Sequence, residues 1–364
     1  NPCLYARDAP KPGCPLKPTT AFVLVHVDDF MITAPANVQQ EIYRKWPFEV
    51  KIVCANLKKA DNPLYLGMGI SYDQPARKIA IDQQLYITAM YQALDLDIKN
   101  QPLQPLKTRA QITPSTEANP KRLATAKEAQ WYRKAVMSAL WVARLTHPTA
   151  AFPCQHLAGV NHAPTEEAMK AAKDLWGYLY RHRMDKITYN PMGLPPAQRN
   201  TLLAYVDSDW AADKHDRKSI TGYIIFLNGA AVAWKSAKQK AMADSSASAE
   251  MYALAVVLKA ITPARDLLRL MGHEQHQPTL VYEDNQAVIL SLKAGFIATK
   301  HRHIDVASQV CRERRDDNEV YFVWTPSALN LSDALTKNTA ATGLETTRTK
   351  LHGEVHIDHP PIHP

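Results

Sequence analysis

The chain has 364 residues, of which 46% are hydrophobic and 21% are charged, so it is long enough for two or three domains with cores of their own. Its net charge of +8 fits a polyanionic partner, although an ordinary basic protein has the same balance. The five cysteines include no CxxC pair, which argues against a cysteine zinc site or a disulfide framework and favours a reducing, cytosolic or nuclear setting.

No apolar run reaches the length of about 20 residues that spans a bilayer, so we expect no membrane partner. The sequence opens at Asn1 without a methionine, and we expect it to be part of a longer protein.

The amino-terminal segment 21–33 has two apolar runs that flank Asp28 and Asp29, which predicts a β-hairpin with the acid pair at its turn. Beyond the hairpin, apolar periodicity predicts strands over 64–72 and 78–82 and helices over 37–48 and 83–94.

The middle of the chain is predicted to be helical. Four prolines among polar residues make 101–120 a linker or extended connection. Helices are expected over 126–145 and 165–182, the second capped by Thr165. Its buried stripe consists of residues at helical spacing: Met169, Ala172, Trp176 and Leu179.

A second linker, 193–200, precedes a segment in which strands and helices alternate. The dipeptide Asn228-Gly229 between two apolar runs is a strong hairpin signal. Strands are expected over 202–207, 220–227, 230–235, 279–283 and 319–324. Helices are expected over 285–293 and 303–315. Two further helices are expected, one of about twenty residues from Ser246 and one from about Leu331. The Thr-, His- and Pro-rich residues 339–364 are expected to form a disordered tail.

Four acids in this part of the chain lie beside apolar segments: Asp207, Glu250, Asp284 and Asp333. A carboxylate inside a core-forming segment is costly unless it is neutralised, and carboxylate oxygens are ligands that Mg²⁺ takes. The pattern therefore indicates a metal site. Asp209 competes with Asp207, because residues two apart on a strand share a face; the strand end favours Asp207.

Basic residues gather near the same strands: Arg217, Lys218, Lys235, Lys238 and Lys240. They either contact phosphates of a nucleic acid or form a solvated face, and the sequence leaves both readings open.

Several motifs resemble the ribonuclease H domain of copia-type retrotransposon polyproteins. They are Asp207–Asp213, Asp216–Tyr223, Ser245–Glu250, Glu283–Gln286, Lys300–Asp305 and Leu331–Lys337. Upstream, Val25–Asp29 resembles the aspartate pair of the reverse transcriptase palm, and Tyr65–Gly67 resembles the primer-contacting element. Tyr132–Leu140 and Leu145–Pro148 resemble the segment after the palm.

The resemblance implies an α/β fold with four parts. A partial palm occupies 1–100, and a mainly helical thumb or connection occupies 101–197. A ribonuclease H-like domain with a five-stranded mixed sheet and flanking helices occupies 198–338, and the tail follows over 339–364.

The resemblance also implies the chemistry. The four acids would bind two Mg²⁺ ions, with Mn²⁺ as a substitute, and hydrolyse the RNA strand of RNA–DNA hybrids. Asp28 and Asp29 would hold the polymerase metals together with a third aspartate. Because only about twenty residues precede the hairpin that carries this pair, we expect no polymerisation by this chain alone and assign that activity to the longer parent.

His303 is a further auxiliary candidate beside Asp209, with a capping or core role as the alternative. The expected partners are nucleic acid, other parts of the Pol polyprotein or a second copy of the chain, in a cytoplasmic virus-like particle or the nucleus. Two competing hypotheses remain: a repurposed element that binds nucleic acid without cutting it, and an interaction scaffold.

Overall fold

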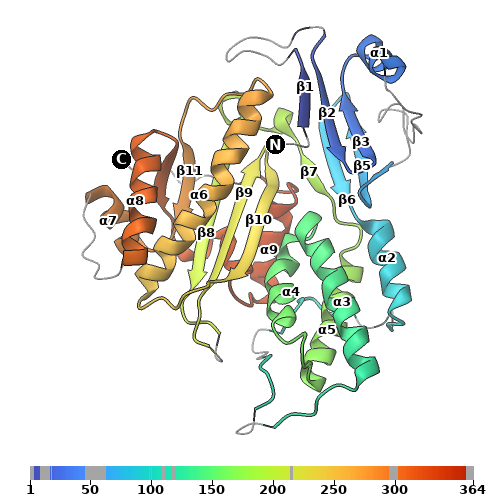
Figure 1. Cartoon of the computed structure of the whole chain (residues 1–364), viewed down its shortest axis with the longest axis vertical. Helices are drawn as coiled ribbons and strands as arrows, with labels where there is room; N and C mark the ends of the chain where they lie inside the picture. Colours follow the sequence, from blue (N-terminus) through green and yellow to red (C-terminus); the bar gives the residue numbers. More distant parts are fainter. Residues whose placement is uncertain are drawn as a thin grey trace.

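The computed structural model describes residues 4–8, 17, 19–45, 63–97, 99, 101–107, 112–116, 120–213, 216–294 and 302–357, with the backbone alone for 302–304. In these residues the strands form sheets of three, four and five strands. Figure 1 shows the two smaller sheets near each other, the helices α3 to α5 beyond them, and the five-stranded sheet with its own helices on the other side of the molecule.

The three-stranded sheet contains the expected hairpin. Strand β2 turns through Val27 and Asp28 into β3, and His26 pairs with Asp29 in the antiparallel register. The acid pair therefore lies at the hairpin end, as predicted. The strands and the helix that follows are β1 (Leu4–Arg7), β2 (Ala21–His26), β3 (Asp29–Thr33) and α1 (Ala36–Lys45).

The four-stranded sheet corrects one prediction. The single strand expected over 64–72 is interrupted, because Leu66 and Gly67 adopt positive φ angles of 52° and 76° and turn the chain. The sheet also recruits a strand from much later in the sequence. Its strands are β4 (Leu64–Tyr65), β5 (Met68–Asp73), β6 (Lys78–Asp82) and β7 (Ile187–Tyr189).

The helical middle has a single apolar core built around Tyr132, Trp176 and Leu179. Thr165 caps α5 by accepting a hydrogen bond from the Ala168 amide at 3.2 Å, which confirms the predicted start of that helix. One helix, α4, was not predicted. The helices are α2 (Gln84–Ala93), α3 (Ala126–Leu145), α4 (Ala151–Ala158) and α5 (Glu166–Arg181).

The five-stranded sheet has the order β10-β9-β8-β11-β12. Strand β9 is antiparallel to both of its neighbours, β10 and β8, whereas β8, β11 and β12 are parallel. This mixed sheet with flanking helices is the ribonuclease H-like fold that was expected. Its strands are β8 (Leu202–Asp209), β9 (Ile220–Leu227), β10 (Ala230–Lys238), β11 (Thr279–Glu283) and β12 (Val320–Trp324).

The two faces of this sheet are covered by different elements. Alternate strand residues such as Val206 and Ile225 pack under α6 and its neighbours, and residues such as Tyr205 and Ile224 pack on the opposite side. The covering helices of the first face are α6 (Ser246–Leu270), α7 (Gln286–Ala294) and α8 (Arg302–Asp316). The second face is covered by α9 (Ala341–Leu351) and the 3₁₀ helix η5 (Leu331–Leu335).

The prediction of a disordered tail is wrong for much of its length, because α9 docks on the sheet. Leu344 and Leu351 are buried, and the buried Arg348 pairs with Asp185 at 2.6 Å. Gly353 has a φ of 74°, and a Cβ there would meet the Thr188 carbonyl oxygen. None of the helices in the described ranges is long and apolar enough to cross a membrane.

Candidate metal centre

Asp207 lies near the carboxyl end of β8, the central strand of the five-stranded sheet, and is only 4% exposed. The hydrophobic run that forms the strand buries this carboxylate along with its neighbours. Asp209, two residues later on the same face, is half-buried and lies outside the closest group of acids. The structure thus favours Asp207 over its competitor.

Glu250 reaches the same place from another element. Ser245 caps α6 through the Ser248 amide at 3.2 Å, and Glu250 follows in the second turn of the helix, 4% exposed. Asp284 comes directly after β11, the strand that pairs in parallel with β8. Carboxyl ends of adjacent parallel strands share one sheet edge, which is why Asp284 and Asp207 meet.

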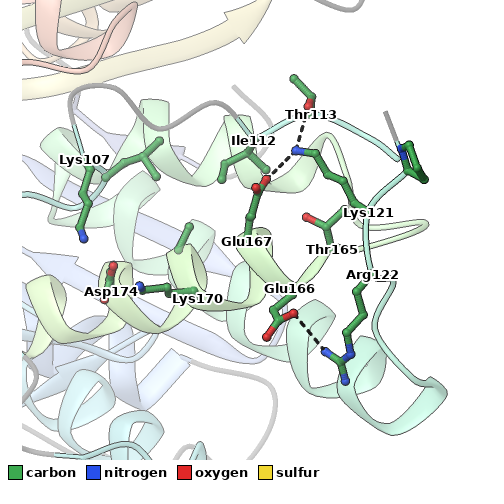
Figure 2. Close-up of a pocket in the computed structure, with 13 residues that line it drawn as sticks. Lys107, Ile112, Thr113, Lys121, Arg122, Thr165, Glu166, Glu167, Lys170 and Asp174 are labelled. Atoms are coloured by element: carbon green, nitrogen blue, oxygen red, sulfur yellow. Dashed lines mark hydrogen bonds and ion pairs between the residues drawn. The ribbon is translucent and has the colours of Figure 1, made fainter. Parts of the chain in front are cut away.

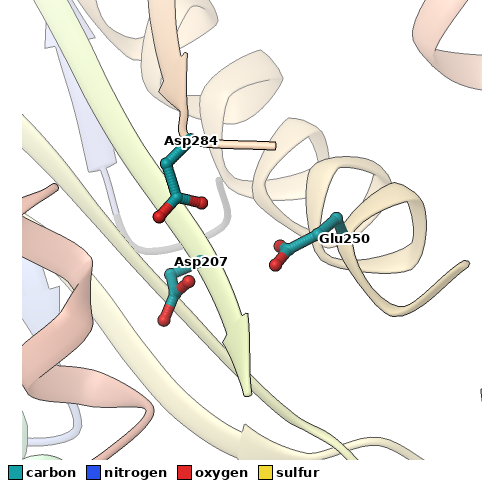
Figure 3. Close-up of side chains that lie close together, drawn as sticks. All are labelled: Asp207, Glu250 and Asp284. Atoms are coloured by element: carbon teal, nitrogen blue, oxygen red, sulfur yellow. The ribbon is translucent and has the colours of Figure 1, made fainter. Parts of the chain in front are cut away.

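The three acids Asp207, Glu250 and Asp284 each offer an oxygen within 4.8 Å of the others. Figure 3 shows the side chains of the strand-borne acids beside each other, with Glu250 extending toward them from its helix. Oxygen ligands with this spacing suit a hard divalent cation.

Asp333 joins the cluster from η5. Asn330 anchors this segment by donating from its amide to the Val206 carbonyl oxygen at 2.9 Å. Three residues after Asp333, the hydroxyl of the buried Thr336 donates a hydrogen bond to Asp207 Oδ2. The ammonium of Lys337 lies 2.9 Å from Asp333 Oδ1. Asp333 lies outside the group of three acids within 4.8 Å, but it is near enough to Asp207 and Asp284 for their charges to influence its pKa.

The close approach of η5 depends on Gly222, which pairs with Asp207 in the β8–β9 register. A Cβ at Gly222 would lie 2.8 Å from the Leu335 Cβ and 3.2 Å from the Leu335 carbonyl carbon. Only glycine lets the backbone that carries Asp333 and Thr336 lie this near to the strand.

Burial and mutual repulsion make these acids reluctant to ionise. Burial, followed by the charges of Glu283, Asp207 and Asp284, raises the pKa of Glu250 to about 11. Burial and the charge of Asp333 raise the pKa of Asp207 to about 6. A divalent cation would reverse both shifts, because an opposite charge favours the ionised form.

Glu283 is a site residue that the sequence did not single out. It is fully buried, its Oε1 accepts the Asn285 amide at 2.9 Å, and its Oε2 has no hydrogen-bond partner. Glu250 Oε2 is likewise buried without a partner. Unpaired carboxylate oxygens in a buried acid cluster fit a site built for a cation. The sequence signal for Glu283 was weak, since it only precedes a stronger candidate.

Trp324 is a second residue that sequence reasoning missed. Its exposed side chain lies at the end of β12, and its indole N–H donates to the Asp284 carbonyl oxygen at 3.0 Å. It therefore steadies the turn that presents Asp284.

The acid pair of the hairpin has different surroundings. Asp28 and Asp29 are exposed, and among the described residues no third metal-ligating side chain joins them in a close group. The polymerase metals therefore stay a prediction. His303 lies in the first turn of α8, but its side chain is outside the described residues.

The predicted basic cluster divides into two kinds of residue. Lys238 pairs with Asp213 and with Asp216, the latter at 3.4 Å, and Lys218 lies 3.7 Å from Asp216. The other three side chains are exposed: Arg217, Lys235 and Lys240.

A separate pocket of about 920 Å³ lies beside the amino-terminal end of α5. Figure 2 shows Lys121 between Glu167 and Thr113, at 2.5 and 3.1 Å, and Arg122 beside Glu166. Its lining includes none of the four acids.

Comparison with known proteins finds relatives among retrotransposon polyproteins. The chain is 25% identical over 335 residues to the "Retrovirus-related Pol polyprotein from transposon RE1" of Arabidopsis thaliana, which covers 91% of this chain and 21% of that protein. It is 28% identical over 276 residues to the corresponding polyprotein from transposon TNT 1-94 of Nicotiana tabacum, covering 75% of this chain and 20% of that protein. Over most of its length the chain is similar to copia-type retrotransposon Pol polyproteins.

The chain spans about a fifth of the length of those relatives. No family model matches it. Among solved structures, LC11-RNase H1 from a compost metagenome aligns with 38% of this chain and 93% of that chain, at 18% identity and a TM-score of 0.31.

Proposed function

We propose that this chain is part of a copia-type Pol polyprotein and hydrolyses the RNA strand of RNA–DNA hybrids with two Mg²⁺ ions, or Mn²⁺ in their place. The observation that carries the proposal is the convergence of Asp207, Glu250 and Asp284 within 4.8 Å, with Asp333 near Asp207 and Asp284. Divalent ions in such a site supply activation of the attacking water and stabilisation of the leaving 3′-oxygen.

The chain's own residues supply position and charge compensation. Asp207 and Asp284 hold their oxygens on the sheet edge, and Glu250 closes the group from the opposite side. Thr336 fixes one oxygen of Asp207 by its hydroxyl, which leaves the other free as a ligand. Asp207, Glu250 and Asp333 lie in secondary-structure elements and Asp284 directly follows β11, which suits a preorganised metal site.

Substrate selection is proposed to follow helix shape and 2′-hydroxyl contacts, because base edges are poorly accessible in an A-like duplex. Exposed Lys235 and Lys240 on and after β10, together with Arg217, are proposed to contact phosphates. Other parts of the polyprotein or a second copy are the proposed protein partners, in a cytoplasmic particle or the nucleus. DNA synthesis is assigned to the longer parent protein.

The test is cleavage of a hybrid labelled on its RNA strand, in Mg²⁺ and in EDTA. We expect cleavage of the RNA strand in Mg²⁺ only, and none of a double-stranded DNA of the same sequence. Asp207→Asn serves as the inactive reference. Tight hybrid binding without cleavage in any divalent ion would favour a repurposed binding module instead.

A further inference from the structure

Lys337 is a basic residue inside the acidic cluster that the proposed reaction does not yet use. Its Nζ lies 2.9 Å from Asp333 Oδ1, one helical turn away. Its own amide donates to the Asp333 carbonyl oxygen at 3.1 Å, so the backbone between the two is fixed. The side chain is 46% exposed, which leaves its ammonium free to move toward solvent.

Among the described residues, Lys337 is the one lysine or arginine whose side-chain nitrogen lies within 4.0 Å of a carboxylate oxygen of the four acids. Its charge opposes the rise in the pKa of Asp207 that burial and Asp333 cause, and it does the same for Asp209. The acids in turn outweigh burial and raise the pKa of Lys337, so the ammonium stays charged.

We propose that Lys337 is the resident counter-cation of the metal centre. Its ammonium occupies an oxygen of Asp333 while no divalent ion is bound, leaves that oxygen when an ion binds, and then contacts a phosphate of the hybrid substrate. The second step rests on the proposed nuclease function, whereas the first concerns only metal binding.

The chemistry of a lysine suits both tasks. An ammonium on a flexible four-carbon stem is a compact point charge that can exchange one oxygen partner for another. Carboxylate and phosphate oxygens are both acceptors for it. Thr336 and Lys337 therefore have different roles. The Thr336 hydroxyl fixes Asp207, and the Lys337 ammonium neutralises Asp333 until a divalent cation binds.

The proposal makes opposite predictions for the metal-free and metal-bound states. Without Lys337 the acids repel each other unscreened, so the metal-free fold should melt at a lower temperature. A divalent ion would no longer compete with a nearby positive charge, so Mg²⁺ affinity should rise, by roughly tenfold for one charge at this distance. If Lys337 only supported η5, its removal would lower both the melting temperature and the Mg²⁺ affinity.

The experiment compares the full chain with Lys337→Met, Lys337→Arg and Lys259→Met. Lys259 is an exposed lysine on α6 that forms no ion pair within the described part of the chain. Three quantities are measured: the melting temperature in EDTA, Mg²⁺ affinity by calorimetry without nucleic acid, and hybrid binding in Ca²⁺, another hard cation that takes carboxylate oxygens. Lys337→Met is expected to melt earlier, bind Mg²⁺ more tightly and bind hybrid more weakly, with a salt slope smaller by about one.

Lys337→Arg keeps the charge and should retain Mg²⁺ affinity near that of the unsubstituted chain, and Lys259→Met should change none of the three. Unchanged or weaker Mg²⁺ binding by Lys337→Met overturns the counter-cation role. An unchanged salt slope overturns the phosphate contact. If the unsubstituted chain binds Mg²⁺ but cleaves no hybrid, the proposed nuclease function fails while the calorimetry still decides the role of Lys337 toward the metal.

Discussion

Gly222 faces Asp207 across the antiparallel β8–β9 pair, and the missing side chain of the glycine is what admits the segment that brings Asp333 to the same place. The geometry of the centre therefore depends on this close backbone approach as well as on the elements that carry the acids.

Gly222→Ala should separate the fourth acid from the other three. The new methyl group would lie 2.8 Å from Leu335 Cβ, so η5 has to shift. We expect a stability loss of about 1–3 kcal/mol, as overpacking typically costs, and weaker Mg²⁺ binding by calorimetry. Gly343→Ala in α9, where the nearest atom is a Thr339 methyl at 3.3 Å, is the matched control. Equal Mg²⁺ affinity in both variants would refute this account of the glycine.

Glu250→Gln should change how stability depends on pH. Since the pKa of Glu250 is raised to about 11, the metal-free folded chain keeps a proton that the unfolded chain releases above about pH 4.5. The folded state then binds more protons, so stability falls as pH rises, by up to about 1.4 kcal/mol per pH unit for one such group. Glutamine removes this titration.

Thermal melts in EDTA between about pH 7.5 and 9, where histidines and ordinary carboxylates no longer titrate, are the measurement for this variant. The decline should be shallower in Glu250→Gln than in the unsubstituted chain. Parallel pH profiles would mean that Glu250 is already ionised in the folded state.

Arg348→Met should loosen the docked carboxyl-terminal helix. The guanidinium pairs with Asp185 at 2.6 Å, Glu345 at 2.7 Å and Glu354 at 3.2 Å. Removing it leaves the largely buried Asp185 short of a partner, which we expect to cost roughly 3–5 kcal/mol. Denaturant unfolding measures the loss. Adding Asp185→Asn should restore part of it, and a double variant no more stable than the single one would speak against the pair.

Lys235→Ala and Lys240→Ala should weaken hybrid binding, because both side chains are exposed and are proposed to contact phosphate. Each lost contact should reduce the slope of log affinity against log salt by about 0.9. Lys238→Ala is the comparison, since its ammonium is already paired with Asp213 and Asp216. If the slope of log affinity against log salt is the same for all three variants, Lys235 and Lys240 do not contact the phosphates.

The sequence predicted those elements whose signals are local. Asn228 and Gly229 take φ angles of 51° and 89° in the turn of the expected hairpin, and Thr165 caps its helix as expected. The four acids were identifiable because each interrupts an apolar run. These features depend on near neighbours in the chain.

The elements that the sequence missed depend on distant partners. Helix α4 contains Pro153 and has no clear periodic stripe, and it is fixed by burial against α3 and the sheet. Helix α9 carries few apolar residues and is fixed by Arg348 and its acidic partners. Glu283 lies at the end of β11, and Lys337 follows η5. Their roles become visible only when the folded chain brings these segments together.

The central claim is that the clustered acids hold divalent cations, and Asp284→Asn tests it with little risk to the fold. Replacing one acid by its neutral isostere relieves repulsion, so the melting temperature in EDTA should hold or rise, while hybrid cleavage falls on the order of a hundredfold or more.

The most direct measurement is a calorimetric titration of Mg²⁺ into the metal-free chain without nucleic acid. Saturable binding by the unsubstituted chain that is lost in Asp284→Asn is the predicted result. An absence of binding, or equal binding by both proteins, would contradict a metal centre at Asp207, Glu250 and Asp284.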